Sequence, residues 1–505
     1  MTNTPLQHIR EPRLGFGHGQ ELEYPKDGLF LFGPLEDKAN PAEMRIGIIG
    51  TPDGLNCFRE WVESIRRYIP PKDPNKPHHA GWPGFQAVFG TRWPEEPLVE
   101  LTVSENAVRT SIRIKDRHEA IYKTVALFEE PIRKHLRQNE APPAMWFVVI
   151  PEEVYRYGRP KSVVPEKERI MGNQPFTPET GRWILHQSSL FAEDRKAAEI
   201  YRYELNFHHQ MKARLLDLRA VLQIVRDTTL TPHRFTQDGR LIREPEDPAT
   251  VAWNLCTTAF FKASGKPWKL ASVRLGVCYV GLVYKQDHTD PAAGNACCGA
   301  QMFLDSGDGV VFRGAVGPWY SEKLKEYHLN KEKASELMSL VVEAYRDLHG
   351  MPPAELFIHG KTRFNDDEWE GFKSVVPDET NLVGVRIRPT NELKLYRPGK
   401  MPVLRGTAYL PTKRTGYLWT KGFIPRLDTY PGWEVPNPLL IEIHRGEADL
   451  LRVMTDVMGL TKINFNACQF ADGQPVTLKF ADAVGEILTA APVPDLPPLP
   501  FRHYI

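Results

Sequence analysis

Four polar side chains in the middle of the sequence have the types and the spacing to hold one phosphate group. His208 and Lys212 are four residues apart in the run NFHHQMKARLLDL, so on a helix both point from the same face. Gln223 follows where that helix passes into a strand, and Lys262 ends the next helical stretch. Lysine supplies a compact positive charge, and histidine and glutamine supply hydrogen-bond donors. Their convergence predicts a site for a terminal phosphate, and a solvated helix face is the alternative for the His208–Lys212 pair.

Alternating strands and amphipathic helices in the first half must position these residues. Strands are expected at 44–50 and 144–150, a helix at 54–68, a helix-to-strand passage at 215–224 and a helix at 248–263. Several units of this kind predict a Rossmann-like α/β domain.

The second half follows a different order. Three antiparallel strands are expected first, then a helix and a strand, at 273–284, 299–304, 310–314, 331–349 and 354–359. This is the order that opens a ribonuclease-H-like fold. A helix at 366–375, strands at 381–388 and 439–444 and a helix at 447–460 extend it. The predicted fold class is therefore α/β, with a Rossmann-like domain followed by a ribonuclease-H-like domain.

The composition sets broad limits on the function. The chain has 505 residues, of which 41% are hydrophobic and 25% charged, as expected for a globular protein of several domains. Lys and Arg total 64 against 63 for Asp and Glu, so a nucleic-acid surface would require local clustering of charge. The start lacks a secretory pattern, and no apolar run approaches about 18 residues. We expect a cytoplasmic protein without a membrane segment.

The four phosphate-site residues resemble the pocket of an Argonaute MID domain, in which a guide strand's 5′ phosphate is held. The run FKASGKPWKL at 261–270 is similar to the junction between the MID and PIWI domains of prokaryotic Argonautes. Further ordered matches, such as WFVVIPEEVYRYGRP and LTKINFNAC, extend the resemblance to short prokaryotic Argonautes. It implies a MID domain with a short N-terminal extension at 1–265 and a PIWI domain at 266–505. His208, Lys212, Gln223 and Lys262 would bind the guide phosphate.

The same resemblance implies a PIWI domain that has lost its slicing site. Catalytic Argonautes hold two magnesium ions with clustered carboxylates, but Val283 and Lys361 stand where two of these aspartates belong. Asp482 matches the last position, and an ordinary surface or helix-start aspartate is its alternative. Lys361 and Arg363 would contact a phosphate backbone instead, or would be solvated loop charges. We therefore expect no catalytic residues in this chain.

The resemblance also places the chain's end at the guide pocket. The apolar end FRHYI would fold back, so that the carboxylate of Ile505 and Gln223 share a magnesium ion with the guide phosphate. The extended Pro-rich stretch at 492–500 is long enough to reach. A disordered tail is the alternative.

Short Argonautes work with a second protein, and the resemblance implies its kind. They bind a small guide RNA, recognise complementary single-stranded DNA of plasmids or phage, and activate an APAZ-containing effector in a heterodimer. A TIR-APAZ protein that consumes NAD is the expected effector, and a sirtuin-like or nuclease APAZ partner is the runner-up. A different class of function, an active nuclease using Asp305, Glu355 and Asp482, is the rival hypothesis, with a purely structural α/β protein as the third.

Overall fold

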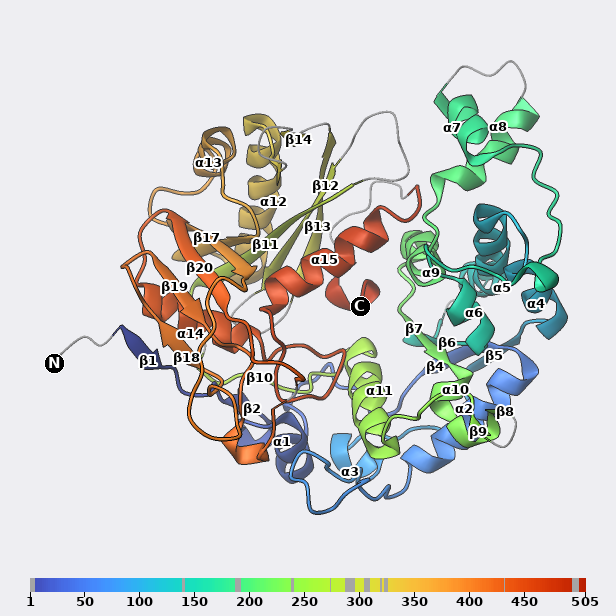
Figure 1. The fold of residues 1–505 in the computed structure, drawn as a ribbon, viewed down its shortest axis with the longest axis horizontal. Coiled ribbons are helices and arrows are strands. Elements are labelled where there is room, and N and C mark those ends of the chain that lie inside the picture. The colour runs from blue at the N-terminus through green and yellow to red at the C-terminus, as the bar shows by residue number, and fades with distance from the viewer. Residues whose placement is uncertain are drawn as a thin grey trace.

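The protein consists of two α/β halves with the end of the chain between them (Figure 1). The computed structural model describes residues 5–138, 141–186, 192–237, 240–272, 274–286, 296–303, 309–317, 320–321, 326–430, 432–492 and 499–505. Residue 273, residues 304–308 and most of the stretch at 492–500 lie outside this description.

The first half is built on a four-stranded parallel sheet. Its strands lie in the order β5 (Val99–Thr102), β4 (Ile46–Gly50), β6 (Met145–Ile150) and β7 (Leu222–Arg226). Every residue of β4 and β6 is buried, as is typical of parallel strands covered on both faces.

Helices cover both faces of this sheet. Side chains of α2 (Pro52–Ile65) and α11 (Pro248–Lys262) share one hydrophobic cluster with the sheet. Side chains of α5 (Arg117–Gln138) and α9 (Phe207–Arg214) share another with its opposite face. The Rossmann-like layering predicted for the first half is confirmed.

The second half is built on a ten-stranded mixed sheet. The order of its strands is β1 (Leu6–His8), β18 (Thr407–Tyr409), β19 (Thr415–Leu418), β20 (Leu439–Arg445), β17 (Asn381–Pro389), β16 (Glu355–Gly360), β11 (Val277–Gln286), β12 (Ala296–Phe303), β13 (Gly309–Gly317) and β21 (Leu499–Pro500). β11, β12 and β13 are antiparallel to one another, whereas β16 and β17 run parallel to β11. This is the strand order predicted for a ribonuclease-H-like fold.

Two pairs of helices flank the large sheet. α12 (Lys331–His349) and α13 (Asp366–Lys373) cluster with side chains of one face, and α14 (Leu450–Leu460) and α15 (Val476–Leu488) with those of the other. α12 has the predicted bounds because Asn330 caps its start and Gly350, with φ of 74°, ends it. α14 begins three residues later than expected because the Asp449 side chain accepts a hydrogen bond from the backbone N–H of Arg452.

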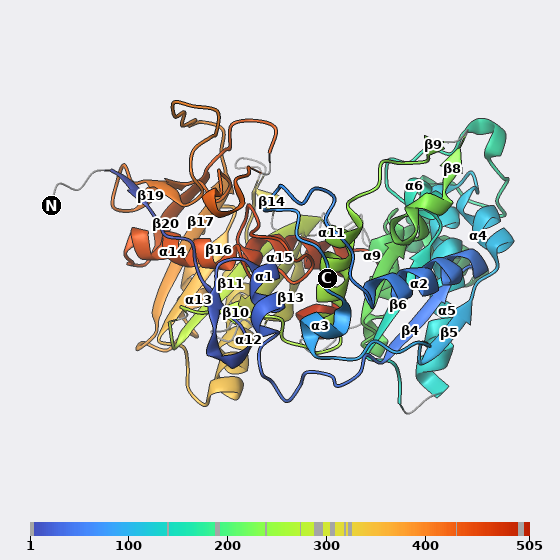
Figure 2. The ribbon, with the colours of Figure 1, turned by 90° about the horizontal axis from the view of Figure 1, so that it is seen from below.

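The first residues of the chain belong to the second half. β1 pairs with β18, and β2 (Leu14–Gly15) pairs with β10 (Lys269–Leu270). β1 is the last strand at one edge of the large sheet, and Figure 2 shows the start of the described chain running along this half of the molecule. Glu11 forms ion pairs with the buried Arg405 and Lys462, so the N-terminal extension is tied to the PIWI-like half.

Shorter elements complete the structure. These are β3 (Glu21–Leu22), α1 (Pro25–Phe32), α3 (Phe85–Phe89), α4 (Glu105–Ile112), α6 (Glu152–Tyr157), α7 (Pro178–His186), α8 (Ala192–Ala198), α10 (Asp227–Leu230), β8 (Thr236–Gln237), β9 (Arg240–Leu241), β14 (Tyr320–Ser321) and β15 (Glu326–Tyr327). Within the part of the chain that the structure describes, no helix combines the length and the apolar composition that a membrane crossing requires.

Candidate functional site

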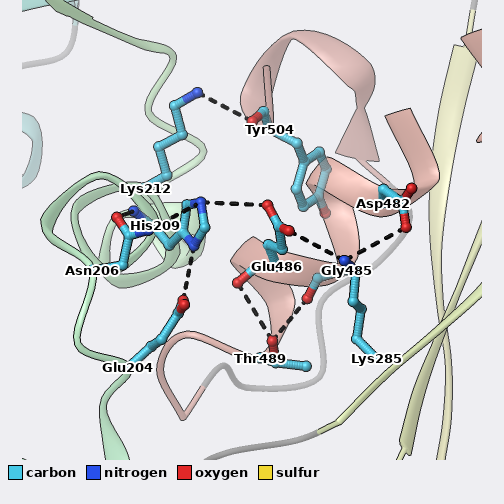
Figure 3. Close-up of polar contacts among 10 residues, drawn as sticks. All are labelled: Glu204, Asn206, His209, Lys212, Lys285, Asp482, Gly485, Glu486, Thr489 and Tyr504. Carbon is cyan, nitrogen blue, oxygen red and sulfur yellow. Dashed lines mark hydrogen bonds and ion pairs between the residues drawn. The ribbon is translucent and has the colours of Figure 1, made fainter. Parts of the chain in front are cut away.

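The first lysine of the predicted site lies inside the protein, on α9. The helix begins after Asn206, whose side chain accepts a hydrogen bond from the backbone N–H of His209. Lys212 is only 4% exposed, and its Nζ donates to the backbone oxygen of Tyr504 at 3.1 Å (Figure 3). A solvated helix face is therefore the wrong interpretation of Lys212.

The second lysine approaches the same region from α11. Lys262 is the last residue of that helix and is 2% exposed. Its Nζ donates to the backbone oxygen of Leu222 at 2.7 Å and to Oε1 of Gln223 at 2.8 Å. The structure thus joins two of the predicted residues directly, at the start of β7.

Neither lysine has a carboxylate partner among the described side chains. No aspartate or glutamate oxygen lies within 4.0 Å of either ammonium nitrogen there. Removal from water lowers the pKa of Lys212 to about 7. Burial, and then the charge of Lys212, lowers the pKa of Lys262 well below its usual range. Because a buried unpaired charge costs several kcal/mol, the pair is an unsatisfied cationic site that an anion would complete.

His208 faces the same pair of charges, but from the solvent side. Its side chain is exposed and lines the pocket at the start of α9. Desolvation and then the charges of Lys212, His209 and Lys262 lower the pKa of His208 well below its usual range. A neutral imidazole follows, which can still donate one hydrogen bond.

The end of the chain packs into this region. The ring of Phe501 stacks on Phe480 with centroids 3.9 Å apart, and Tyr504 and Ile505 are buried. Arg502 donates to Oγ of Ser264 at 2.5 Å, just beyond α11. The expected folding back of the C-terminus is confirmed, and a disordered tail is excluded for residues 499–505.

A pocket of about 540 Å³ lies at the start of α9, and its lining includes residues that the sequence did not single out. The ring of Tyr155 lies between two guanidinium groups, at 3.7 Å from Arg159 and 3.9 Å from Arg226. His208 and His209 form part of the wall. The two guanidinium groups cover both faces of the ring and bring positive charge to the pocket, which suits the phosphates of a nucleotide.

The three positions assigned to a lost slicing site also come together. β11 and β16 are parallel neighbours with Leu282 opposite Gly360, so Val283 and Lys361 follow side by side. Val283 is buried in the core, and Lys361 forms an ion pair with Asp482 on α15. The alternatives were a solvated loop charge for Lys361 and an ordinary surface aspartate for Asp482. Neither accounts for the ion pair that the two side chains form.

The rival set of carboxylates is not assembled in the same way. Glu355 lies at the start of β16, whereas Lys361 and Asp482 meet beyond its end. Glu355 pairs instead with Arg274, and Asp305 lies outside the described residues. Among the residues that are described, no three His, Cys, Asp or Glu side chains are grouped so that they could hold a metal ion.

Comparison with solved structures identifies the fold. Clostridium butyricum Argonaute bound to a guide DNA with a 5′ deoxycytidine and a 19-mer target DNA is similar over 96% of this chain, with a TM-score of 0.60 and 12% identity. The A. aeolicus Argonaute is similar over 98%, with a TM-score of 0.54 and 12% identity. Aa-Ago with externally bound siRNA is similar over 99%, with a TM-score of 0.57 and 14% identity. The fold is that of an Argonaute.

The likeness covers only part of these Argonautes. The chain spans 53%, 54% and 56% of the C. butyricum, A. aeolicus and siRNA-bound structures, about half of each. At the level of sequence, no family model and no curated protein matches it. The shared architecture is the MID–PIWI arrangement of an α/β Argonaute.

The buried lysines predict an unusual dependence of stability on pH. Below about pH 7 the folded protein carries the charge of Lys212 at full cost, and at higher pH it releases a proton that the unfolded chain keeps until about pH 10.4. The free energy of unfolding should therefore rise with pH above about 7, by up to about 1.4 kcal/mol per unit for this lysine.

Lys212→Met should reduce that rise, measured as the denaturant midpoint between about pH 7.5 and 9. Lys333→Met is the matched control, because Lys333 is exposed and paired with Glu336. Equal slopes for the wild type and Lys212→Met would show that the lysine is not desolvated.

Proposed function

We propose that this protein is the guide-binding subunit of a prokaryotic immune complex. It binds a small 5′-phosphorylated guide RNA, recognises complementary single-stranded DNA of an invading plasmid or phage, and activates an associated effector enzyme. The observation that carries this proposal is the pair of buried lysines, Lys212 and Lys262, which act on each other electrostatically and have no carboxylate partner among the described residues. A pocket of nucleotide size lies next to them along the chain, at the start of α9.

A terminal phosphate is the ligand that best completes this pair. It carries close to two negative charges at neutral pH and three acceptor oxygens, so it offsets both ammonium groups at once. Each sheltered charge-assisted hydrogen bond contributes about 1.5–3 kcal/mol. His208 and Gln223 add donors, and Arg159 and Arg226, which both contact the ring of Tyr155, add positive charge in the neighbouring pocket. An internal phosphodiester carries only one negative charge, so it would offset the charge of only one of the two lysines.

Magnesium is the ion we propose to accompany the phosphate, held by Gln223 and the carboxylate of Ile505. Mg²⁺ prefers hard oxygens and usually binds through one or two protein oxygens together with ligand phosphates. An amide oxygen and a terminal carboxylate have this chemistry. Oε1 of Gln223 already accepts a hydrogen bond from Lys262. The two oxygen ligands therefore suit a magnesium ion only when a phosphate is also bound and offsets the charge of the lysines.

We also propose that the protein does not cut its target. Two metal ions at a ribonuclease-H-like site require several carboxylates, whereas Lys361 pairs with Asp482 there and Val283 offers no ligand. Binding without cleavage leaves the response to another protein.

A heterodimer with an APAZ-containing effector is the assembly we propose, because the resemblance to short Argonautes implies such a partner. A second chain would then hold the distal part of the guide–target duplex. A TIR-APAZ enzyme that consumes NAD is our first choice, leading to NAD depletion and abortive infection. A sirtuin-like or nuclease APAZ partner is the alternative.

The phosphate site predicts selectivity for the chemistry of the guide's end. Replacing Lys212 and Lys262 together with methionine keeps their apolar stems but removes two charge-assisted contacts. Affinity for a 5′-phosphorylated guide should fall about 100-fold or more, and affinity for a 5′-hydroxyl guide by no more than about threefold. Fluorescence anisotropy with both guides measures this. Equal losses for the two would mean that the lysines contact only the backbone.

The lost slicing site predicts an inert protein in a cleavage assay. Guide-loaded protein with Mg²⁺ or Mn²⁺ should leave a labelled complementary target intact, because two ligand positions of a two-metal site are Val283 and Lys361. Products at a fixed distance from the guide's 5′ end that disappear in Asp482→Asn would contradict the proposal and favour the nuclease hypothesis.

The proposed effector predicts target-dependent NAD loss. The co-expressed pair should consume almost no NAD with guide alone, and should consume it when guide and complementary single-stranded DNA are both present, because activation requires a ligand that favours the active arrangement. NAD measured with matched, mismatched and absent target checks this. NAD consumption at the same rate with and without the complementary target would rule out a sensor.

A further inference from the structure

A chain of charged side chains crosses from the slicing position toward the guide pocket (Figure 3). Asp482 pairs with Lys361 and also lies 3.5 Å from Nζ of Lys285. The same Lys285 nitrogen is 3.1 Å from Glu486. Glu486 in turn lies 3.5 Å from Nε2 of His209, the neighbour of His208 on α9. Each carboxylate therefore serves two nitrogen-bearing partners.

The cations of this region form a row where three central strands of the large sheet, β11, β16 and β17, approach one another. Lys285 is near the end of β11, and Lys361 and Arg363 follow the end of β16. Arg386 on β17 lies opposite Gly360, the last residue of β16. Neighbouring strands are about 4.8 Å apart. The four positive groups from these three adjacent strands therefore lie in one row.

The row is open to solvent and carries more cations than its carboxylates neutralise. The side chains of Lys361 and Arg363 are 39% and 59% exposed. Arg363 and Arg386 share one carboxylate, that of Glu442, at 2.8 and 3.5 Å. Lys285 and Lys361 share Asp482. Phosphate groups that follow one another along a strand match such a row in charge.

We propose that Lys361 and Lys285 bind a phosphodiester of a nucleic-acid strand without a metal ion, and that Asp482 is the internal counter-ion which this phosphate displaces. The two ammonium groups then supply part of the positive charge that two divalent ions would have supplied. This inference rests on the proposed function, which brings a guide and its target into the same cleft.

A nucleic-acid strand is favoured over an acidic peptide by the position of the row. α15, which carries Asp482 and Glu486, lies against α9 through the contact of Glu486 with His209. A strand anchored at Lys212 by its 5′ phosphate would begin at the other end of the same ionic chain. The contact needs no base recognition, so it suits a backbone of any sequence.

Whether Asp482→Asn strengthens or weakens duplex binding distinguishes this proposal from a residual metal site. In EDTA, Asp482→Asn should strengthen binding of a guide–target duplex about three- to tenfold, because Lys361 and Lys285 lose their internal competitor. Lys361→Gln should weaken it by a similar factor, as expected for one partly exposed phosphate contact. Lys333→Gln is the matched control. A metal site predicts the opposite: Asp482→Asn weakens binding in Mg²⁺, and EDTA removes the difference between this variant and the wild type.

The experiment uses the full chain, with 5′-hydroxyl target strands so that no second terminal phosphate contributes. Single uncharged methylphosphonates are placed along the target or guide, and anisotropy is measured for the wild type and Lys361→Gln. We expect one or two positions where the neutral linkage weakens binding to the wild type and has no further effect in the variant. Equal sensitivity at every position in both proteins, or weaker binding by Asp482→Asn, overturns the proposal.

Guide binding is measured separately in the same series. If the wild type shows no preference for a 5′ phosphate, the proposed function fails, and the preformed duplex still tests the Lys361 site. If Lys361→Gln keeps the preference for a 5′ phosphate but loses the sensitivity to a methylphosphonate at one position, the proposed function and the Lys361 site are both supported. Melting temperatures of all variants within a few degrees of the wild type exclude unfolding as the cause.

Discussion

The proposed site depends on two buried lysine amino groups, Lys212 and Lys262, for which the described residues provide no carboxylate partner. Lys212 and Lys262 come from helices on opposite faces of the first sheet and meet near the start of β7. An interior that pays for two charges in this way is less stable than one with apolar residues in their place. That cost is offset only when an anion arrives, so the fold holds a preformed site for one.

The chain's end and its beginning both reach across the molecule to make this site possible. The last residues pass from the edge of the large sheet to α9, where the Tyr504 carbonyl accepts from Lys212. The first residues pair with the far edge of the same sheet. The two halves are thereby fixed against each other, and the anion site and the Lys361 row lie on one ionic path.

Local patterns in the sequence predicted much of this, and distance along the chain limited the rest. The bounds of α12 and the order of the strands followed from caps and periodicity. The four phosphate-site residues were found because they lie within 55 residues of one another, at 208–262. Tyr155 was missed because its partner Arg226 follows a long intervening segment. The pairing of Leu6 with Tyr409 joins residues at opposite ends of the chain, and no local signal encodes it. α5 and α15 were also not predicted.

The end chemistry of nucleic acid that co-purifies with the protein tests the central claim most directly. The extracted strands are labelled with polynucleotide kinase before and after phosphatase treatment. If Lys212 and Lys262 select a terminal phosphate, short strands from the wild type will accept label only after phosphatase. Strands from the double methionine variant will be few or will lack this preference. Strands from the wild type that label equally well without phosphatase would contradict the account.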